Sequence, residues 1–168
     1  MSAPQTAQLA LVAAVRQLTA AGIEGAATDA RRLLAHAMGM APDRLSLHLQ
    51  DPLTPEQATA FHAALTARAA RQPVAQITGR RLFWGQDFHV TRDTLDPRPE
   101  TEGLVAAALE RPFVKVLDLG TGTGCILLSL LKSMPMATGL GGDISAAALD
   151  VARGNAERLG LASRARFQ

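Results

Sequence analysis

The chain has 168 residues, of which 48% are hydrophobic and 19% are charged, so it lies outside the range of intrinsically disordered chains. Seventeen basic residues against 15 acidic ones leave a net charge of +2, which does not indicate a nucleic-acid-binding surface. The single cysteine excludes an intramolecular disulfide. Because the N-terminus has neither a basic segment nor a long apolar run, we expect no signal peptide, no membrane span and a cytoplasmic protein.

Residues 1–72 are predicted to form a small all-helical domain. Thr28 is expected to cap a second helix that ends near Gly39. A capping box with proline at the first helical position is predicted at residues 54–57, and Pro73 stops the helix that it opens. The first helix is expected to bury an apolar stripe made of Leu9, Leu11, Val12, Val15 and Leu18.

Residues 73–97 are predicted to connect this domain to the next one through a β-hairpin. Two short runs, 82–84 and 88–90, flank a turn that contains Gly85. Pro99 then suits the first turn of another helix. The buried face of that helix is expected to carry Leu104, Val105, Ala108 and Leu109.

Residues 98–168 are predicted to begin a doubly wound parallel sheet, so the fold class is α/β. A buried strand at 114–119 is followed by a helix, a second strand that leads to Asp143, a helix capped by Ser145 and the start of a third strand near the C-terminus. The second strand contains Gly139, Gly141 and Gly142, which predict that it is weakly held. Since three strands make a small sheet, we expect the N-terminal part of a longer protein.

The strongest functional signal is the segment VLDLGTGTGCI at residues 116–126. Three glycines after a strand allow a sharp turn, and we expect their N–H groups to face a small ligand at the helix N-terminus. The spacing does not fit a dinucleotide fingerprint, because position 125 is cysteine, and no Lys-Ser/Thr pair follows as in a phosphate-binding P-loop. The glycine spacing present here is similar to that of class I S-adenosylmethionine-dependent methyltransferases.

Two acidic residues flank this loop. Asp143 lies 23 residues after Gly120, where a carboxylate can accept hydrogen bonds from both ribose hydroxyls, but an NAD site uses an acid in the same place. A helix-capping carboxylate is the structural alternative for Asp143. Asp118 either orients the loop or the ammonium group of the ligand, or is satisfied by backbone N–H groups.

Other polar residues indicate less. Cys125 is expected to be a small buried residue rather than a nucleophile. The four histidines lack metal-ligand spacing, so no metal site is predicted. A group of arginines either meets an acidic partner or ribosomal RNA, or forms a solvated face. This group consists of Arg68, Arg71, Arg80 and Arg81.

The run PVAQITGRRLFWGQDFHVTRDTLDPRPETEGLV, followed by VLDLGTGTGCI and DIS, resembles the HemK family of peptide chain release factor glutamine N5-methyltransferases. The family transfers a methyl group from S-adenosylmethionine to the glutamine side chain in the GGQ loop of release factors. The resemblance therefore implies a Rossmann-like class I methyltransferase sheet, this cofactor and release factors as protein partners, which the helical domain helps to hold.

The resemblance also implies roles for individual residues. Asp143 should hold the ribose, and Ile144 should pack on the adenine. Arg98 and Thr101 belong to the family element that closes the site from the methionine side. The methionine part of the cofactor should lie in the loop formed by Gly120, Thr121, Gly122, Thr123 and Gly124.

Phe83 or Phe88 in the hairpin is expected either to provide the apolar wall for the target glutamine or to be hairpin core. The family's catalytic Asn-Pro-Pro-Tyr motif is missing, because Asn155 is the only asparagine and the chain has no tyrosine. We therefore expect no catalytic residue within this chain. The alternatives are an adenine-N6 nucleic-acid methyltransferase, which shares that motif, and a non-catalytic binding module.

Overall fold

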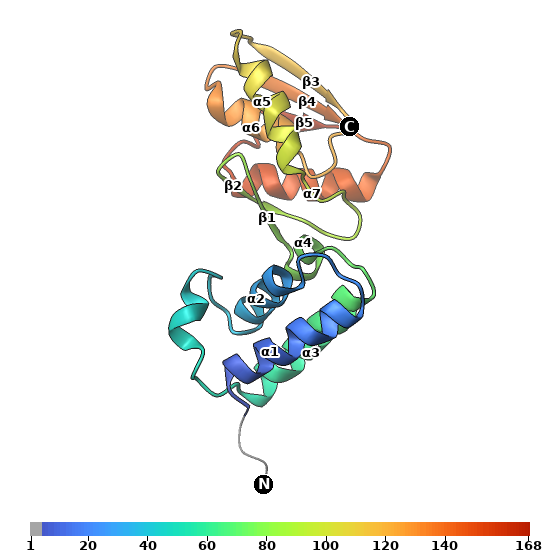
Figure 1. Ribbon diagram of the computed structural model, residues 1–168. Helices are drawn as coiled ribbons and strands as arrows, with labels where there is room; N and C mark the ends of the chain where they lie inside the picture. The colour runs from blue at the N-terminus through green and yellow to red at the C-terminus, as the bar shows by residue number, and fades with distance from the viewer. Residues whose placement is uncertain (1–4) are drawn as a thin grey trace. The chain divides into compact units, whose positions relative to one another are not determined.

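The computed structural model describes residues 5–168 and divides the chain into two compact units, one ending at Thr78 and one beginning at Gly79. The segment expected to connect two domains, residues 73–97, is shared between them: its helical part belongs to the first unit and its hairpin to the second. The first is the helical unit and the second is the sheet unit (Figure 1).

The helical unit contains three main helices, α1 (Ala7–Ala20), α2 (Ala26–Ala37) and α3 (Pro55–Ala69). A 3₁₀ helix, η1 (Arg44–His48), and a short helix, α4 (Val74–Thr78), complete it. Helix α2 contacts α1, α3 and α4 and is therefore the central element. The all-helical prediction is confirmed.

Of the two predicted N-terminal caps, one is confirmed and one is wrong. The Thr54 hydroxyl accepts a hydrogen bond from the Gln57 N–H at 3.2 Å, and the Gln57 side chain accepts one from the Thr54 N–H at 3.0 Å, which completes the capping box. Thr28 lies inside α2 instead, because Gly25, with a φ of 72°, turns the chain three residues earlier. The Gly25 carbonyl accepts the N–H groups of Thr28 and Asp29.

The predicted apolar stripe of α1 is wrong for two of its five members, because Leu11 and Val15 are partly buried against the core and Leu18 lies within it. Leu9 and Val12 are 61% and 46% exposed, whereas Leu18 is fully buried. The other buried positions of α1 are alanines, which let its backbone approach the neighbouring helices closely. The small side chains therefore decide which face of α1 points inward. They are Ala7, Ala10 and Ala14.

The sheet unit begins with the predicted hairpin, β1 (Arg80–Phe83) and β2 (Gln86–His89), which pair antiparallel. Its two turn residues, Trp84 and Gly85, both have positive φ, 49° and 67°, as a tight two-residue hairpin turn requires. The hairpin prediction is confirmed.

A 3₁₀ turn, η2 (Pro99–Thr101), then leads into α5 (Glu102–Leu109), with Pro99 at the first helical position as expected. Val105 is fully buried in α5, but Leu104 is 57% exposed, so its assignment to the buried face is wrong.

The parallel sheet has the order β3 (Lys115–Leu119), β4 (Thr138–Gly142), β5 (Ala165–Phe167). Helix α6 (Cys125–Ser133) connects the first two strands and α7 (Ala146–Arg158) connects the last two (Figure 1). The predicted parallel sheet with alternating helices, including its third strand, is confirmed.

The two faces of β3 differ, and the expectation of a fully buried strand is wrong. Val116 packs into the core with the leucines of α6. Leu117 and Leu119 point to the other face and are 59% and 78% exposed. The alternation follows from the pleat, because successive side chains of a strand point to opposite faces and the helices pack against only one of them here.

The glycines of β4 have a packing reason. A Cβ on Gly139 would lie 2.4 Å from the Leu127 Cδ1 atom of α6, and one on Gly141 would lie 2.8 Å from the Phe167 ring and the Thr121 hydroxyl. The bulky residues that ordinarily hold a strand do not fit here. β4 is instead held by ladders to β3 on one side and β5 on the other.

Candidate functional site

The glycine loop, residues 120–124, joins β3 to α6. Gly120, Gly122 and Gly124 all have positive φ, at 73°, 53° and 77°, a conformation that side-chain-bearing residues adopt at a cost. A Cβ on Gly120 or Gly122 would meet no atom within 4 Å, whereas one on Gly124 would lie 3.3 Å from the Ala152 Cβ of α7. The first two glycines therefore border open space, and the third allows α7 to pack closely.

The N–H groups of the loop are mostly used within the chain, so the expectation that they face a ligand is wrong for four of them. The Gly142 carbonyl, at the end of β4, accepts the N–H groups of Gly120 at 2.8 Å and Thr121 at 2.9 Å. The Gly124 N–H donates to the Thr121 carbonyl at 2.8 Å. The fourth N–H group, that of Gly122, donates to the Asp143 carboxylate. The loop can therefore contact a ligand mainly through its surface shape and not through several free N–H donors.

Asp143 fastens the loop to the start of α7. Its Oδ2 accepts the Gly122 N–H and its Oδ1 accepts the Ser145 N–H, both at 2.9 Å. The Ser145 hydroxyl in turn caps α7 by accepting the Ala148 N–H at 3.2 Å, as predicted for Ser145. The hydrogen bonds from Ser145 and Gly122 lower the pKa of the Asp143 carboxyl. A charged carboxylate therefore stands beside the open side of the loop.

Asp118 supports the loop from the end of β3. Its Oδ2 accepts a hydrogen bond from the Thr121 hydroxyl at 2.8 Å, so its partner is a side chain and not the backbone N–H groups of the structural alternative. Thr121 and Thr123 are only 5% and 2% exposed. Both side chains are therefore buried, and the exposed surface of the loop comes from Gly120 and Gly122.

Asn155, on α7, is a residue of this site that the sequence did not indicate as one. It is completely buried, and its Nδ2 donates to the Thr123 carbonyl in the loop at 2.9 Å. The same side chain bonds both backbone groups of His89 in β2. A signal was present, because position 155 falls on the helix face that carries Ala148 and Ala152, and a polar residue on a buried face must find partners.

The other predicted cofactor residues lie in the same unit with different exposures. Ile144 follows Asp143 and is fully exposed, so its side chain has room for a ligand. Arg98 is exposed and Thr101 is half-buried, at the two ends of η2, where the Thr101 N–H donates to the Arg98 carbonyl at 3.0 Å. Among residues 5–168, no hydrogen bond joins either of them to the glycine loop.

The two hairpin phenylalanines are core residues in this structure. Phe83 is 1% exposed and Phe88 is fully buried, and their rings pack edge to face with centroids 6.2 Å apart. Neither side chain is accessible to a substrate here, which agrees with the alternative that both belong to the hairpin core.

Three arginines of the predicted group form ion pairs, and within residues 5–168 no ion pair involves the fourth, Arg71. The Arg68 Nε lies 2.7 Å from Asp29, the Arg80 Nε donates to Asp87 at 2.8 Å, and the Arg81 Nε lies 3.5 Å from Asp96. Acids distant in sequence neutralise these cations.

Cys125 is buried as predicted, and burial raises the pKa of its thiol. Across residues 5–168, no group of three potential metal ligands comes together, and no helix is both long and apolar enough to cross a membrane.

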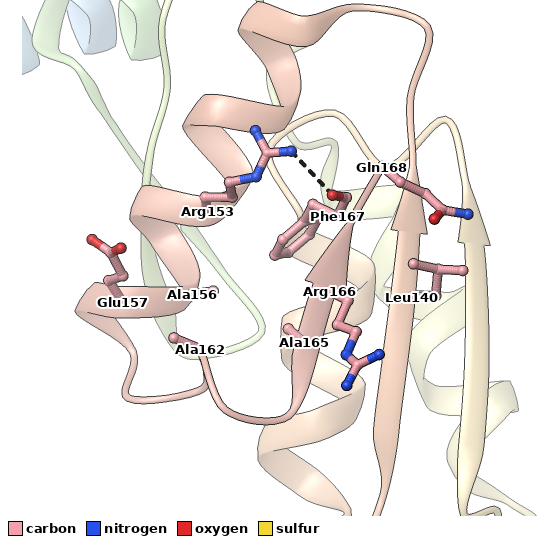
Figure 2. Close-up of a pocket in the computed structure, with 9 residues that line it drawn as sticks. All are labelled: Leu140, Arg153, Ala156, Glu157, Ala162, Ala165, Arg166, Phe167 and Gln168. Atoms are coloured by element: carbon pink, nitrogen blue, oxygen red, sulfur yellow. Dashed lines mark hydrogen bonds between the residues drawn. The ribbon is translucent and has the colours of Figure 1, made fainter.

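A cavity of about 450 Å³ lies beside β5 and α7, away from the glycine loop. Figure 2 shows Arg153 reaching across it to donate to the Phe167 carbonyl, at 3.0 Å, with Arg166 and Glu157 near its rim. Arg153 also pairs with Asp150 at 2.7 Å. None of the predicted site residues lines this cavity.

Comparisons with known proteins agree with the two units. Residues 10–79 match the PrmC N-terminal domain, and residues 111–168 match a methyltransferase domain. A release factor glutamine methyltransferase from Cereibacter sphaeroides is 68% identical over 92% of this chain and 56% of its own length. One from Rhodospirillum rubrum is 47% identical over 90% of this chain and 47% of its own.

Among solved structures, a SAM-dependent methyltransferase from Geobacter sulfurreducens, in complex with S-adenosyl-L-homocysteine, is 36% identical. It covers 42% of this chain and 28% of its own, with a TM-score of 0.37. The chain spans about half the length of the curated relatives that it matches.

Proposed function

Because the chain belongs to the release factor glutamine methyltransferase family, as the resemblance predicted, we propose that its sheet unit binds S-adenosylmethionine at the glycine loop. In this proposal the methionine part lies against Gly120 and Gly122, Asp143 holds the ribose, and Ile144 packs on the adenine. The protein transfers the methyl group to the glutamine amide in the GGQ loop of a release factor.

Two observations together support this proposal: most N–H groups of the loop already donate hydrogen bonds within the chain, and two carboxylates lie next to the loop. Phosphates bind loops that present several free N–H donors, but four of the N–H groups in residues 120–124 already have partners within the chain. Asp118 and Asp143 place carboxylates on either side of the same loop. This environment suits a ligand with cationic sulfonium and ammonium groups better than a dinucleotide.

The chemistry of transfer needs groups outside these 168 residues. An amide nitrogen is a poor nucleophile, so its N–H groups must be held and its lone pair aimed at the methyl group, and such positioning can supply about 7–11 kcal/mol of a barrier. We propose that an Asn-Pro-Pro-Tyr motif elsewhere in the full-length protein does this. The helical unit contributes to holding the release factor.

Two glycine substitutions test the cofactor site. Gly122→Ala and Gly160→Ala both place a Cβ at positive φ, 53° and 70°, and both Cβ atoms meet no atom within 4 Å. Each should cost about 1 kcal/mol of stability through backbone strain. Only Gly122→Ala fills space that the proposed ligand occupies. Gly160 ends α7 and lies outside the site, so it is the matched control.

Calorimetry with S-adenosylhomocysteine on the full-length protein measures the difference. We expect Gly122→Ala to weaken binding at least about tenfold through steric exclusion and Gly160→Ala to bind as the unmodified protein does. Equal affinity of the two variants would overturn the placement of the cofactor. Methylation of a GGQ-containing peptide by the full-length protein tests the reaction, and its absence with cofactor bound would overturn the proposed substrate.

A further inference from the structure

The side chain of Asn155 pairs with β2 as a neighbouring strand would. Its Oδ1 accepts the His89 N–H at 2.7 Å and its Nδ2 donates to the His89 carbonyl at 3.0 Å. One carboxamide thus satisfies both backbone groups of the residue that ends the hairpin. This pairing anchors β2 to α7, although the two residues are 66 positions apart in the sequence.

The second Nδ2 proton of Asn155 reaches the glycine loop. It donates to the Thr123 carbonyl at 2.9 Å, so the same side chain contacts the hairpin and the loop. The orientation of the amide is determined by these partners, because a flipped amide would place its oxygen against two carbonyl oxygens and its NH₂ against the His89 N–H. The network therefore works in one arrangement only.

Further contacts connect the hairpin to this network and to α5. Arg158 donates to the Asn155 Oδ1 and to the Asp87 carbonyl of β2, both at 3.3 Å. At the hairpin turn, the Trp84 N–H donates to the Glu102 carboxylate at 2.8 Å. Glu102 is the first residue of α5 and follows the segment expected to close the cofactor site. The hairpin is thus hydrogen-bonded to α7 through Asn155 and Arg158 and to α5 through Glu102.

We propose that Asn155 is a positioning residue that couples the hairpin to the cofactor loop, so that the loop binds cofactor tightly only while the hairpin is docked. The inference rests on the proposed function, because it needs a ligand at the loop. It gives the hairpin a role in cofactor affinity, although its two phenylalanines are buried away from the site. Asn155 itself touches no reacting atom.

The substitution Asn155→Asp tests the coupling with little change in shape. It retains an acceptor for the His89 N–H but removes both N–H groups that bond the Thr123 and His89 carbonyls. In the full-length protein we expect S-adenosylhomocysteine to bind about tenfold more weakly, the loss typical of buried hydrogen bonds of this kind. Circular dichroism checks that the variant is folded at the temperature of the measurement.

Trp84 is the only tryptophan among these 168 residues. With any tryptophan elsewhere in the full-length protein replaced by phenylalanine, Trp84 supplies a readout that a purely structural role would not move. Its emission should change when cofactor saturates the unmodified protein, and this change should be lost in the saturated Asn155→Asp variant. A residue that only stabilised the fold would lower the melting temperature but leave the dissociation constant and the Trp84 response intact. That result, or a Trp84 signal in the unmodified protein that ignores bound cofactor, would overturn the coupling.

A second pair of variants decides the question if Asn155→Asp does not fold. Arg158→Gln removes the contacts to Asn155 and Asp87 from the surface of α7, whereas Arg153→Gln removes comparable contacts to Asp150 and Phe167 on the same helix. We expect Arg158→Gln to weaken binding about threefold and Arg153→Gln to leave it unchanged. Equal affinities would overturn the coupling. A complete lack of binding by the unmodified protein would instead overturn the proposed function, and this inference with it.

Discussion

The helical unit and the sheet unit place their apolar side chains differently. In the helical unit, Leu18, Leu33, Leu34 and Leu45 are all fully buried in one core that three helices share. In the sheet unit, helices cover the face of β3 that carries Val116, whereas alternate residues of the same strand remain exposed. The helices close a core among themselves. The sheet shows that a strand pattern typical of full burial does not by itself supply both covering layers.

The largest effect expected from this contrast is on association. The exposed leucines of β3 lie two residues apart on one face, and such apolar patches bind other surfaces. We predict that the 168-residue chain alone self-associates as its concentration rises, has no methyltransferase activity and binds cofactor weakly or not at all. Residues 1–78 alone should remain monomeric. Light scattering over a range of concentrations measures the association of the 168-residue chain and of residues 1–78.

Replacing Leu117 and Leu119 together by glutamine is the control, because it removes the apolar patch without touching the helix-covered face. It should reduce association. A stable monomer of the unmodified chain at high concentration, together with methylation of a GGQ substrate, would contradict the prediction.

The next largest effect concerns cofactor affinity, which should depend on the sheet unit alone. Asp143→Ala in the full-length protein should weaken binding by about 2–3 kcal/mol, about 30- to 150-fold, because charge-assisted hydrogen bonds to the ribose are lost. Calorimetry measures the change. An effect below about threefold would mean that Asp143 serves only the loop and the α7 cap, which the structure already shows.

The titration of Asp143 sharpens that distinction. Its pKa in the folded state lies below the ordinary value of 3.8, so the stability it contributes is present above pH 3.8 and is lost as the pH falls through the lower folded value. The Gly122 amide signal followed by nuclear magnetic resonance should report this transition, and Asp143→Asn should abolish it. A transition above pH 3.8 would contradict the hydrogen bonding described here.

A pair of glycine substitutions should change the stability of the sheet unit in opposite directions. Gly139→Ala forces a Cβ against Leu127 and should cost about 1–3 kcal/mol through overpacking. Gly154→Ala lies inside α7 with open space around its Cβ and should add about 0.5–1 kcal/mol of helix propensity. Chemical denaturation measures both. If Gly139→Ala is neutral, close packing is not the reason for that glycine.

The smallest effect concerns the helical unit and its two threonines. Thr54→Ala removes a capping-box hydroxyl and should cost about 1 kcal/mol of the free energy of unfolding. Thr28→Ala replaces a residue inside α2 and should change it by less than about 0.5 kcal/mol. Thermal unfolding of residues 1–78 compares them. Equal costs would restore Thr28 as a cap.

The sequence alone was sufficient for features whose causes lie within a few residues. The capping box at residues 54–57, the hairpin with its turn at Gly85, and the glycine loop between β3 and α6 each follow from local backbone geometry, although Trp84 belongs to the turn and not to the first strand. The alternation of strand and helix likewise predicted the parallel sheet. The position of Asp143 at the end of β4 came from spacing alone.

Only the tertiary structure decided features that depend on distant partners. Gly25 displaced Thr28 as the start of α2, and three alanines join Leu18 on the buried face of α1, whereas Leu9 and Val12 are exposed. The Gly142 carbonyl accepts the N–H groups of Gly120 and Thr121, which the sequence analysis expected to face a ligand. Asn155 gained its partners in the hairpin and the loop because folding brings α7 against both. The physical reason is common to all: a residue's local pattern states its preferences, whereas packing determines which groups are close enough to satisfy them.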